Sequence, residues 1–238
     1  MGAYCVDTLK SELNRIGVSI DENALERLDI YAALLKERNE QVNLTAITDE
    51  RGIALKHFAD SLSLLSAVEL KKGEKVIDVG TGAGFPGVAL LIARPDIDIT
   101  LLDGTNKKLD FIRDVLKETG LTANVLHSRA ELAAKQSEYR EQFSLATARA
   151  VAALNELCEF CLPFVKQGGI FASMKGAKAD EELTAAKKAI HVLGGQVSNV
   201  KQLEITDCGE RSIILIKKTS QTSPKYPRAS AQIAKRPL

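Results

Sequence analysis

The segment 76–87 joins an apolar run, a carboxylate and a set of glycines, and it constrains the fold more than any other part of the chain. Its apolar residues predict a buried strand that ends near Val79, and residues 87–93 predict a helix. The glycines between them predict a turn that can adopt positive φ and let a ligand approach the backbone closely. The helix that follows would offer unpaired N–H groups at its N-terminus. This order predicts a ligand-binding turn within an α/β domain.

Asp78 restricts which ligand the turn accepts. A carboxylate just ahead of the turn repels a pyrophosphate and attracts a ligand with ammonium and sulfonium charges, and S-adenosylmethionine is such a ligand. The residues Gly82–Gly87 also fit the dinucleotide pattern G-x-G-x-x-G, which alone is a weak signal. Phe85 and Pro86 in its spacer would crowd a phosphate. A purely structural glycine-rich turn remains an alternative.

Beyond residue 74 strand-like and helix-like patterns alternate. Strands are predicted at 75–79, 97–102, 124–127, 143–148, 169–174, 200–205 and 212–216, and helices at 87–93, 107–119, loosely at 131–142, at 152–165 and at 180–193. Alternation of this kind predicts a parallel sheet with helices on both faces. The polar segment 206–211 predicts a hairpin between the last two strands. Together they predict the class I methyltransferase arrangement, an α/β Rossmann-like fold with a seven-stranded sheet and a C-terminal antiparallel hairpin.

The two ends of the chain differ from this central part. Residues 1–70 read as helix throughout and predict a small N-terminal helical cap, so residues 71–218 would form the methyltransferase domain. The tail, residues 219–238, is basic: from Lys217 onward there are six basic residues and no acidic one. This charge predicts either contact with a polyanion or a poorly ordered, solubilising terminus.

The composition is that of a soluble protein. Hydrophobic residues make up 45% and charged residues 26% of the 238 residues, and no apolar run is long enough to span a bilayer. The absence of a secretory signal and the use of four cysteines predict a cytoplasmic location. Cys158 and Cys161 lie in an apolar helical pattern, which predicts buried, inert thiols and no metal site.

Polar residues follow the predicted strands where a ligand would bind. Asp103 ends the second strand, where a carboxylate can accept both ribose hydroxyls. Ala130 and Glu131 follow the third strand, where they could meet an adenine edge. Arg149 ends the fourth strand, where it could contact the cofactor, a phosphate or a guanine edge, or could form a structural salt bridge. Lys175 follows the fifth strand.

Several further motifs resemble one known family. They are 39–48 (NEQVNLTAIT), 56–61 (KHFADS), 78–87 (DVGTGAGFPG), 129–131 (RAE), 147–152 (TARAVA), 174–176 (MKG) and 225–228 (KYPR). In this order they are similar to the glucose-inhibited division protein B family, the 16S ribosomal RNA small subunit methyltransferases G, over nearly the whole chain. Two positions depart from the family pattern: Arg38 stands where the family usually has Trp, and Gly104 where it usually has Ser.

The resemblance implies transfer of a methyl group from S-adenosylmethionine to N7 of a guanine in 16S ribosomal RNA, guanine 527 in the RNA's own numbering. Among the cofactor-binding residues Asp78, Gly80, Gly82, Gly84, Phe85, Asp103, Ala130, Glu131 and Arg149, it implies cofactor contacts for Gly80, Phe85, Ala130, Glu131 and Arg149. The partner would be the small ribosomal subunit or its precursor, bound by a monomer without any membrane contact.

Guanine N7 carries a lone pair and no proton, so its methylation needs no general base. Catalysis would then consist of positioning, with Arg149 orienting the base. Lys175, Lys225 and Arg228 are predicted to contact RNA. Asn39, Asn43 and His57 are further candidates for RNA contact. Asn39 and Asn43, at i and i+4, could instead organise the helical cap, and His57 with Asp60 also fits a structural pair on one helical face.

Two other classes of function remain open from the sequence. An NAD-dependent oxidoreductase would need an uncharged residue at Asp78 and a catalytic Tyr-Lys pair or His, which the sequence does not offer. A non-catalytic RNA-binding assembly factor could retain the fold without the reaction. Calorimetry with S-adenosylmethionine and NAD would distinguish a methyltransferase from the oxidoreductase. A labelled-methyl assay would distinguish it from the assembly factor.

Overall fold

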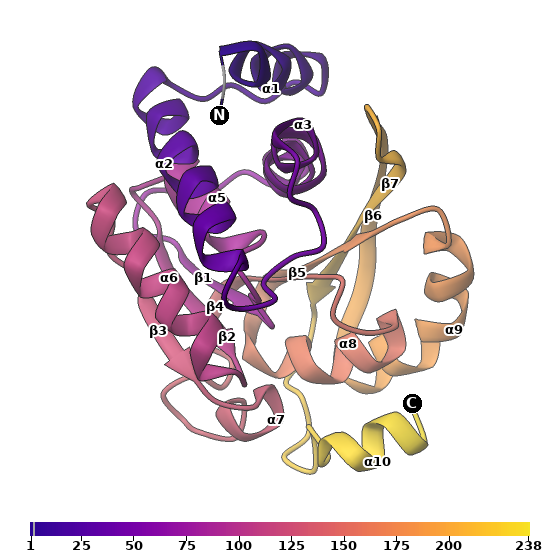
Figure 1. The fold of residues 1–238 in the computed structure, drawn as a ribbon. Helices are drawn as coiled ribbons and strands as arrows, with labels where there is room; N and C mark the ends of the chain where they lie inside the picture. Colours follow the sequence, from indigo (N-terminus) through magenta and orange to yellow (C-terminus); the bar gives the residue numbers. More distant parts are fainter. Residues whose placement is uncertain (2) are drawn as a thin grey trace.

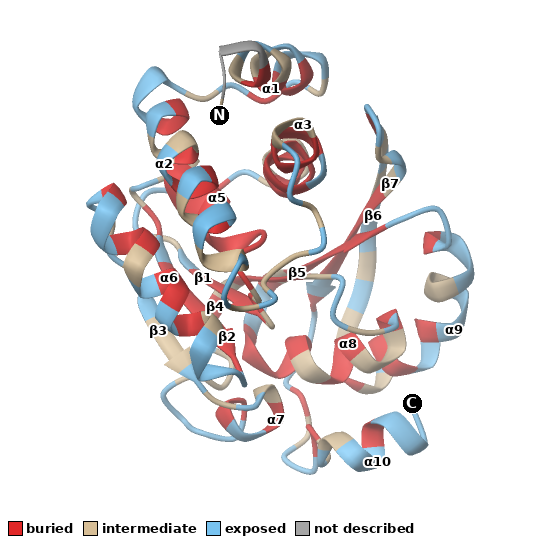
Figure 2. Cartoon of the chain, in the orientation of Figure 1, coloured by how far each residue is buried: buried red, intermediate tan, exposed pale blue. Residues whose placement is uncertain are grey.

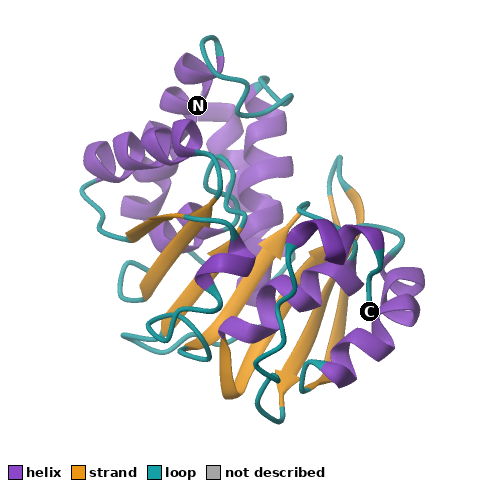
Figure 3. Cartoon of the chain, turned by 90° about the horizontal axis from the view of Figure 1, so that it is seen from below, coloured by secondary structure: helices purple, strands orange, loops and turns teal. Residues whose placement is uncertain are grey.

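The computed structural model describes Met1 and residues 3–238, and in it a seven-stranded sheet carries helices on both faces (Figures 1 and 3). The strands are β1 Lys75–Val79, β2 Asp98–Asp103, β3 Asn124–His127, β4 Phe143–Arg149, β5 Val165–Lys175, β6 Gly195–Ile205 and β7 Gly209–Lys218. Their order across the sheet is β3-β2-β1-β4-β5-β7-β6. Strands β1 to β5 pair in parallel, and β7 is antiparallel to both β5 and β6. The predicted seven strands and terminal hairpin are confirmed.

The last three strands are longer than the sequence predicted. β6 begins at Gly195 and not at residue 200, because it is an edge strand with many polar, exposed side chains and only its end is clearly apolar. The strand order reverses beside β1, which pairs with β2 on one side and β4 on the other. Ligands of open α/β sheets bind at such a reversal, beyond the carboxyl ends of the strands.

Helices connect the strands as predicted, with one correction. They are α5 Gly87–Ala93, α6 Asn106–Thr119, α7 Ala130–Ala133, α8 Leu154–Cys161 with the 3₁₀ turn η3 Leu162–Phe164, α9 Ala179–Val192 and α10 Ser230–Lys235. The loose helical prediction over 131–142 was wrong beyond Ala133. The segment that follows is mostly exposed and offers no apolar face to hold a helix against the sheet.

The sheet separates two apolar clusters, because neighbouring residues of a strand point to opposite faces. Val76 belongs to the cluster with α5 and α6, whereas Ile77 belongs to the cluster with α8 and α9. Figure 2 shows buried residues along the strands and on the inner sides of the helices. Cys158 and Cys161 are fully buried in the second cluster, where burial raises the pKa of both thiols, as expected for inert cysteines.

The N-terminal helices share their core with the sheet. They are α1 Ala3–Arg15, α2 Glu22–Asn39, α3 Glu50–Gly52, the π-helical η1 Ile53–Ala59, α4 Asp60–Leu62 and the 3₁₀ turn η2 Ser63–Ser66. Asp21 begins α2 by accepting a hydrogen bond from the Ala24 N–H at 2.7 Å. Tyr31 and Phe58 from these helices pack against Phe85 and lie in the same cluster as α5 and α6. The predicted cap is therefore packed into the domain that it covers.

The basic tail is also packed, so of the two alternatives that its charge left open, the poorly ordered terminus is wrong. Lys218 is fully buried and donates to Glu141 Oε1 at 2.9 Å and to Thr222 Oγ1 at 2.7 Å. Arg140 donates to the carbonyl oxygens of Thr222 and Tyr226 at 2.7 and 2.9 Å. The tail then passes beneath α8 and ends in α10 (Figure 1).

Arg228 fastens this tail to α8. Its guanidinium donates from Nε and Nη2 to Glu159, whose carboxylate is fully buried, with a shortest distance of 2.6 Å. Its backbone N–H donates to the same carboxylate at 2.7 Å. The side chain of Arg228 is 24% exposed. Arg228 thus holds the tail in place, and its contact with RNA stays a prediction, as does that of the exposed Lys225.

Replacing Arg228 by alanine should destabilise the fold by about 2–4 kcal/mol, because the Glu159 carboxylate would stay buried without its partner. The change is best measured by urea unfolding. Lys235→Ala, an exposed cation in α10, is the matched control and should shift the free energy of unfolding by less than about 0.5 kcal/mol. Equal stability of the two variants would contradict a structural role for Arg228.

Candidate active site

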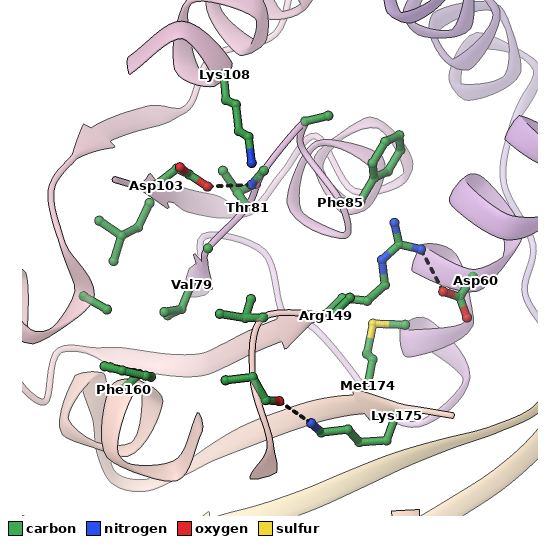
Figure 4. Close-up of a pocket in the computed structure, with 18 of the residues that line it drawn as sticks. Asp60, Val79, Thr81, Phe85, Asp103, Lys108, Arg149, Phe160, Met174 and Lys175 are labelled. Atoms are coloured by element: carbon green, nitrogen blue, oxygen red, sulfur yellow. Dashed lines mark hydrogen bonds and ion pairs between the residues drawn. The ribbon is translucent and has the colours of Figure 1, made fainter. Parts of the chain in front are cut away.

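A large cavity lies at the carboxyl ends of the strands, where the strand order reverses. Its volume is about 1180 Å³. Figure 4 shows two ends, with Asp103 and Lys108 at one and Asp60, Met174 and Lys175 at the other, and Arg149 between them. Pockets that bind one small ligand have volumes of about 300–1,000 Å³, so this cavity has room for a cofactor and part of a second molecule.

The glycine loop forms one wall of the cavity, and its backbone explains why glycine is needed. Gly80 has φ 75°, and a Cβ there would lie 2.8 Å from Val151 Cγ2. Gly84 has φ 102° and faces the other way, since a Cβ there would meet the Tyr31 hydroxyl at 2.6 Å. Gly80 and Gly82 line the cavity, whereas Gly84 does not. This side of the loop packs on α2 through Tyr31, and the cofactor contact of Gly84 stays a prediction.

Asp103 holds the glycine loop at the end of the cavity next to Lys108. Its Oδ2 accepts from the Gly82 N–H at 2.9 Å, and its Oδ1 accepts from the Thr105 N–H at 2.8 Å. Asp103 lines the cavity, as the sequence predicted, together with Ala130 and the carboxylate of Glu131 from α7. Each carboxylate oxygen has a second lone pair, so both can still accept from ribose hydroxyls.

Asp78 lies behind the loop and does not line the cavity. It is fully buried, and its Oδ2 accepts from the Gly87 N–H at 2.8 Å. A Cβ on Gly87 would lie 2.6 Å from that oxygen, so glycine is needed for this contact. Burial raises the pKa of Asp78 to about 6. Its predicted direct contact with a cofactor stays a prediction, and in the structure it anchors the first turn of α5.

Phe85 forms a stack that joins the loop to the N-terminal helices. Its ring lies between His57, at 4.4 Å between centroids, and Tyr31, at 5.2 Å. The Arg149 guanidinium lies over the same ring at 5.1 Å. Phe85 is 6% exposed and still lines the cavity. The stack fixes the glycine loop against η1. No local pattern in the sequence indicated this contact.

Arg149 is held on three sides at the end of β4. Its Nη1 donates to Asp60 Oδ2 at 2.7 Å (Figure 4). The same nitrogen donates to the Lys56 carbonyl oxygen at 3.0 Å, and Nη2 faces His57 Nδ1 at 3.4 Å. Arg149 lines the cavity and also forms a salt bridge with Asp60, so both features that the sequence suggested for it are present. Arg149 is therefore a rigid part of the cavity wall, which suits a positioning role.

His57 is neutral, and its contacts define its tautomer. Because Arg149 can only donate, His57 Nδ1 accepts, and Nε2 carries the proton toward Thr45 Oγ1 at 2.8 Å. Burial, with the charge of Arg149 as a second cause, lowers the pKa of His57 to about 4. His57 and Asp60 both contact Arg149, and their side chains form no hydrogen bond with each other, so a direct pair between them stays a prediction.

Asn39 organises the loop that supports His57. Its Oδ1 accepts from the N–H groups of Leu44 and Thr45 at 2.8 and 2.9 Å, at the end of α2. This confirms the structural alternative for Asn39. Asn43 is exposed in the same loop, and its RNA contact stays a prediction.

Lys175 is paired and buried, whereas RNA binding by this residue would need a free cation. Its Nζ donates to the Ala152 carbonyl oxygen at 2.7 Å and pairs with Glu182 at 2.8 Å, and its side chain is 7% exposed. Glu182 also accepts from the Leu154 N–H at 2.8 Å. Together they fix the loop after β4, in which Ala150 has φ 55°, an uncommon value for a residue with a side chain.

The sequence missed Arg211, which lies at the far end of the cavity. Its Nε donates to Asp60 Oδ1 at 2.9 Å, so Asp60 bridges Arg211 and Arg149. Lys56 and Lys108 also line the cavity. Arg211 stands in a polar segment that the sequence read only as a turn, and no local pattern distinguished it.

The strand order, the glycine loop and the carboxylates at the strand ends define a protein of the class I methyltransferase fold. Solved structures agree on the fold. Precorrin-6y C5,15-methyltransferase from Geobacter metallireducens matches with a TM-score of 0.51 and 17% identity, over 75% of this chain and 92% of its own. The [4+2]-cyclase SpnF matches at 0.53 and 17%, over 68% and 82%. These likenesses show the fold alone.

The sequence comparisons go further. The family model for rRNA small subunit methyltransferase G (GidB) matches residues 24–214. Relatives named ribosomal RNA small subunit methyltransferase G are 42% identical in Clostridium perfringens, over 98% of both chains, and 44% identical in Alkaliphilus metalliredigens, over 97% of both. The chain belongs to the rRNA small subunit methyltransferase G family.

Two further findings concern the described residues alone. In that part of the chain no helix is long and apolar enough to cross a membrane. Nor do three or more His, Cys, Asp or Glu side chains there gather into a group suited to a metal ion.

The raised pKa of Asp78 implies that the stability of the protein depends on pH. Because the folded-state pKa is higher than the ordinary value of 3.8, the stabilising effect of the protonated form is complete below pH 4 and is lost as pH rises through about 6. Asp78→Asn should therefore raise the free energy of unfolding at pH 8, by about 1–3 kcal/mol, and change it little at pH 4. Thermal or urea unfolding at both pH values measures this. A variant that is less stable than the parent at pH 8 would contradict it.

Proposed function

We propose that this protein transfers a methyl group from S-adenosylmethionine to N7 of a guanine in the RNA of the small ribosomal subunit, guanine 527 in the RNA's numbering. The observation that carries the proposal is the family match over nearly the whole chain, joined to a cavity large enough for cofactor and base. The proposed setting is the cytoplasm, where a monomer would act on the subunit or its precursor.

The cofactor end of the cavity fits this donor. The Gly80 and Gly82 backbone leaves the wall bare, the carboxylates of Asp103 and Glu131 can accept from hydroxyl and amine groups, and Phe160 adds an apolar surface. Two carboxylates here, with Asp78 behind the loop, disfavour the pyrophosphate of a dinucleotide. S-adenosylmethionine would supply an activated methyl group on a sulfonium.

The residues around the cavity suit a reaction that depends on positioning. Guanine N7 has no proton to lose. Asp60 contacts both Arg149 and Arg211. The neutral His57, Arg149 and Asp60 are thus held in place by mutual contacts. Their role is to orient the base and exclude water. The base becomes positively charged as it is methylated, so the carboxylates of the site lower the energy of that charge.

The test is transfer of labelled methyl to small subunits from a strain that lacks the modification, followed by mapping of 7-methylguanine. Calorimetry should show binding of S-adenosylmethionine and none of NAD. Label on another base, or no label, would overturn the assignment. Binding of the donor without transfer to any subunit or precursor would favour a non-catalytic assembly factor.

Arg149→Ala should weaken cofactor binding and lower kcat/KM by about 100-fold, because the base and the glycine loop lose their common support. Arg113→Ala, an exposed arginine of α6, is the control and should match the parent. Calorimetry gives the dissociation constant and the methyl assay gives the rates. Unchanged rates for Arg149→Ala would show that Arg149 does not contribute to the site.

A further inference from the structure

We propose that the end of the cavity opposite the glycine loop receives the target guanine, and that Arg211 recognises its O6 there. The inference rests on the proposed function and extends it from the cofactor to the base. The compartment lies around Asp60 and His57 and is lined by five residues, Leu44, Ile47, Met174, Arg211 and Ile213. Arg211 contacts Asp60. Leu44 and Ile47 flank Thr45, which contacts His57. Met174 pairs with Ile213 across β5 and β7.

The lining of this compartment suits a flat base. Leu44 and Ile47 come from the loop after α2, Met174 from the end of β5, and Ile213 from β7. Enzymes that modify a base take it out of the stack and hold it between aromatic or apolar side chains. Because these residues come from separate parts of the fold, they can enclose the two faces of a purine and leave its edge to polar groups.

The chemistry of guanine determines which kind of polar side chain can hold its N7 edge. The edge that carries N7 presents two acceptors, N7 and O6. N7 must keep its lone pair free to attack the methyl group, so a donor can hold this edge only through O6. An arginine beside O6 and away from N7 meets that requirement, and adenine, which has an amino group at the same position, is repelled by it.

Arg149 is poorly placed for this role. Both hydrogens of its Nη1 are used, by Asp60 and by the Lys56 carbonyl, and its Nη2 already faces His57. Turning it toward a base would break these contacts and move its guanidinium off the Phe85 ring. Its geometry is that of a support.

Within the described part of the chain, Arg211 keeps one NH2 group free of contacts, whereas each NH2 group of Arg149 already has at least one. Its Nε is used by Asp60, and its Nη1 donates to the Cys208 and Glu210 carbonyl oxygens at 2.6 and 3.0 Å. Its Nη2 donates to no acceptor among Met1 and residues 5–238, whose side chains the structure describes, so both of its hydrogens are available there. The side chain is 27% exposed and lines the cavity. The three existing contacts hold the guanidinium in one orientation, which preorganises the free donor.

The experiment combines an enzyme variant with a base variant. Small subunits are reconstituted with RNA that carries either guanine or 2-aminopurine at the target position. 2-Aminopurine keeps N7 and the 2-amino group but has hydrogen in place of O6. Methyl transfer to both is measured with the parent protein, Arg211→Met, Arg211→Lys and the control Arg113→Ala. S-adenosylmethionine affinity and thermal unfolding are measured for each.

The ratio of guanine to 2-aminopurine rates should fall about tenfold from the parent to Arg211→Met. Methionine cannot donate to O6, so this variant loses nothing when O6 is absent from the base. Arg211→Lys, which keeps a donor, should give an intermediate ratio, and Arg113→Ala the parent ratio. If either Arg211 variant slows both bases by the same factor, Arg211 is structural and the inference fails. If the parent methylates no guanine while binding S-adenosylmethionine, the proposed function fails first.

Discussion

The carboxylate of Asp60 is the contact on which the site depends. It is nearly buried, and it accepts from Arg149 at 2.7 Å and from Arg211 at 2.9 Å. Because the three residues come from the N-terminal helices, β4 and β7, one group fixes three parts of the fold around a single cavity. A buried carboxylate needs such partners, since an unpaired charge there would be strongly unfavourable.

The glycine loop shows a second constraint, in which stability and ligand binding compete. Asp78 anchors the first turn of α5 through Gly87, yet burial raises its pKa, so its charge lowers the stability of the folded protein at neutral pH. A negative charge behind the loop favours a cationic ligand in front of it. A functional site can retain an unfavourable group for such a reason.

Two peripheral segments support the site from outside. The N-terminal helices place Tyr31, His57 and Phe58 around Phe85, so the loop packs against the helices that the sequence set apart as a cap. On the other face the tail is tied to α8 through Arg228 and Glu159, and α8 carries Phe160 to the cavity. Both segments belong to the folded domain, because their polar contacts and apolar side chains are buried in it.

The sequence by itself determined the class of fold and the order of its strands and helices, because periodicity, glycine turns and residues at strand ends are local features. Local pattern also indicated Arg149, His57 and Asn39, but with open alternatives. Only the tertiary structure decided that Asp78 and Gly84 face away from the cavity, that Lys175 and Arg228 are paired, and that Arg211 joins the site. These outcomes depend on which partner meets a side chain across the fold, for example Arg211 and Asp60, which are 151 positions apart. No local pattern records that distance, since the pairing exists only when the sheet and the helices have packed.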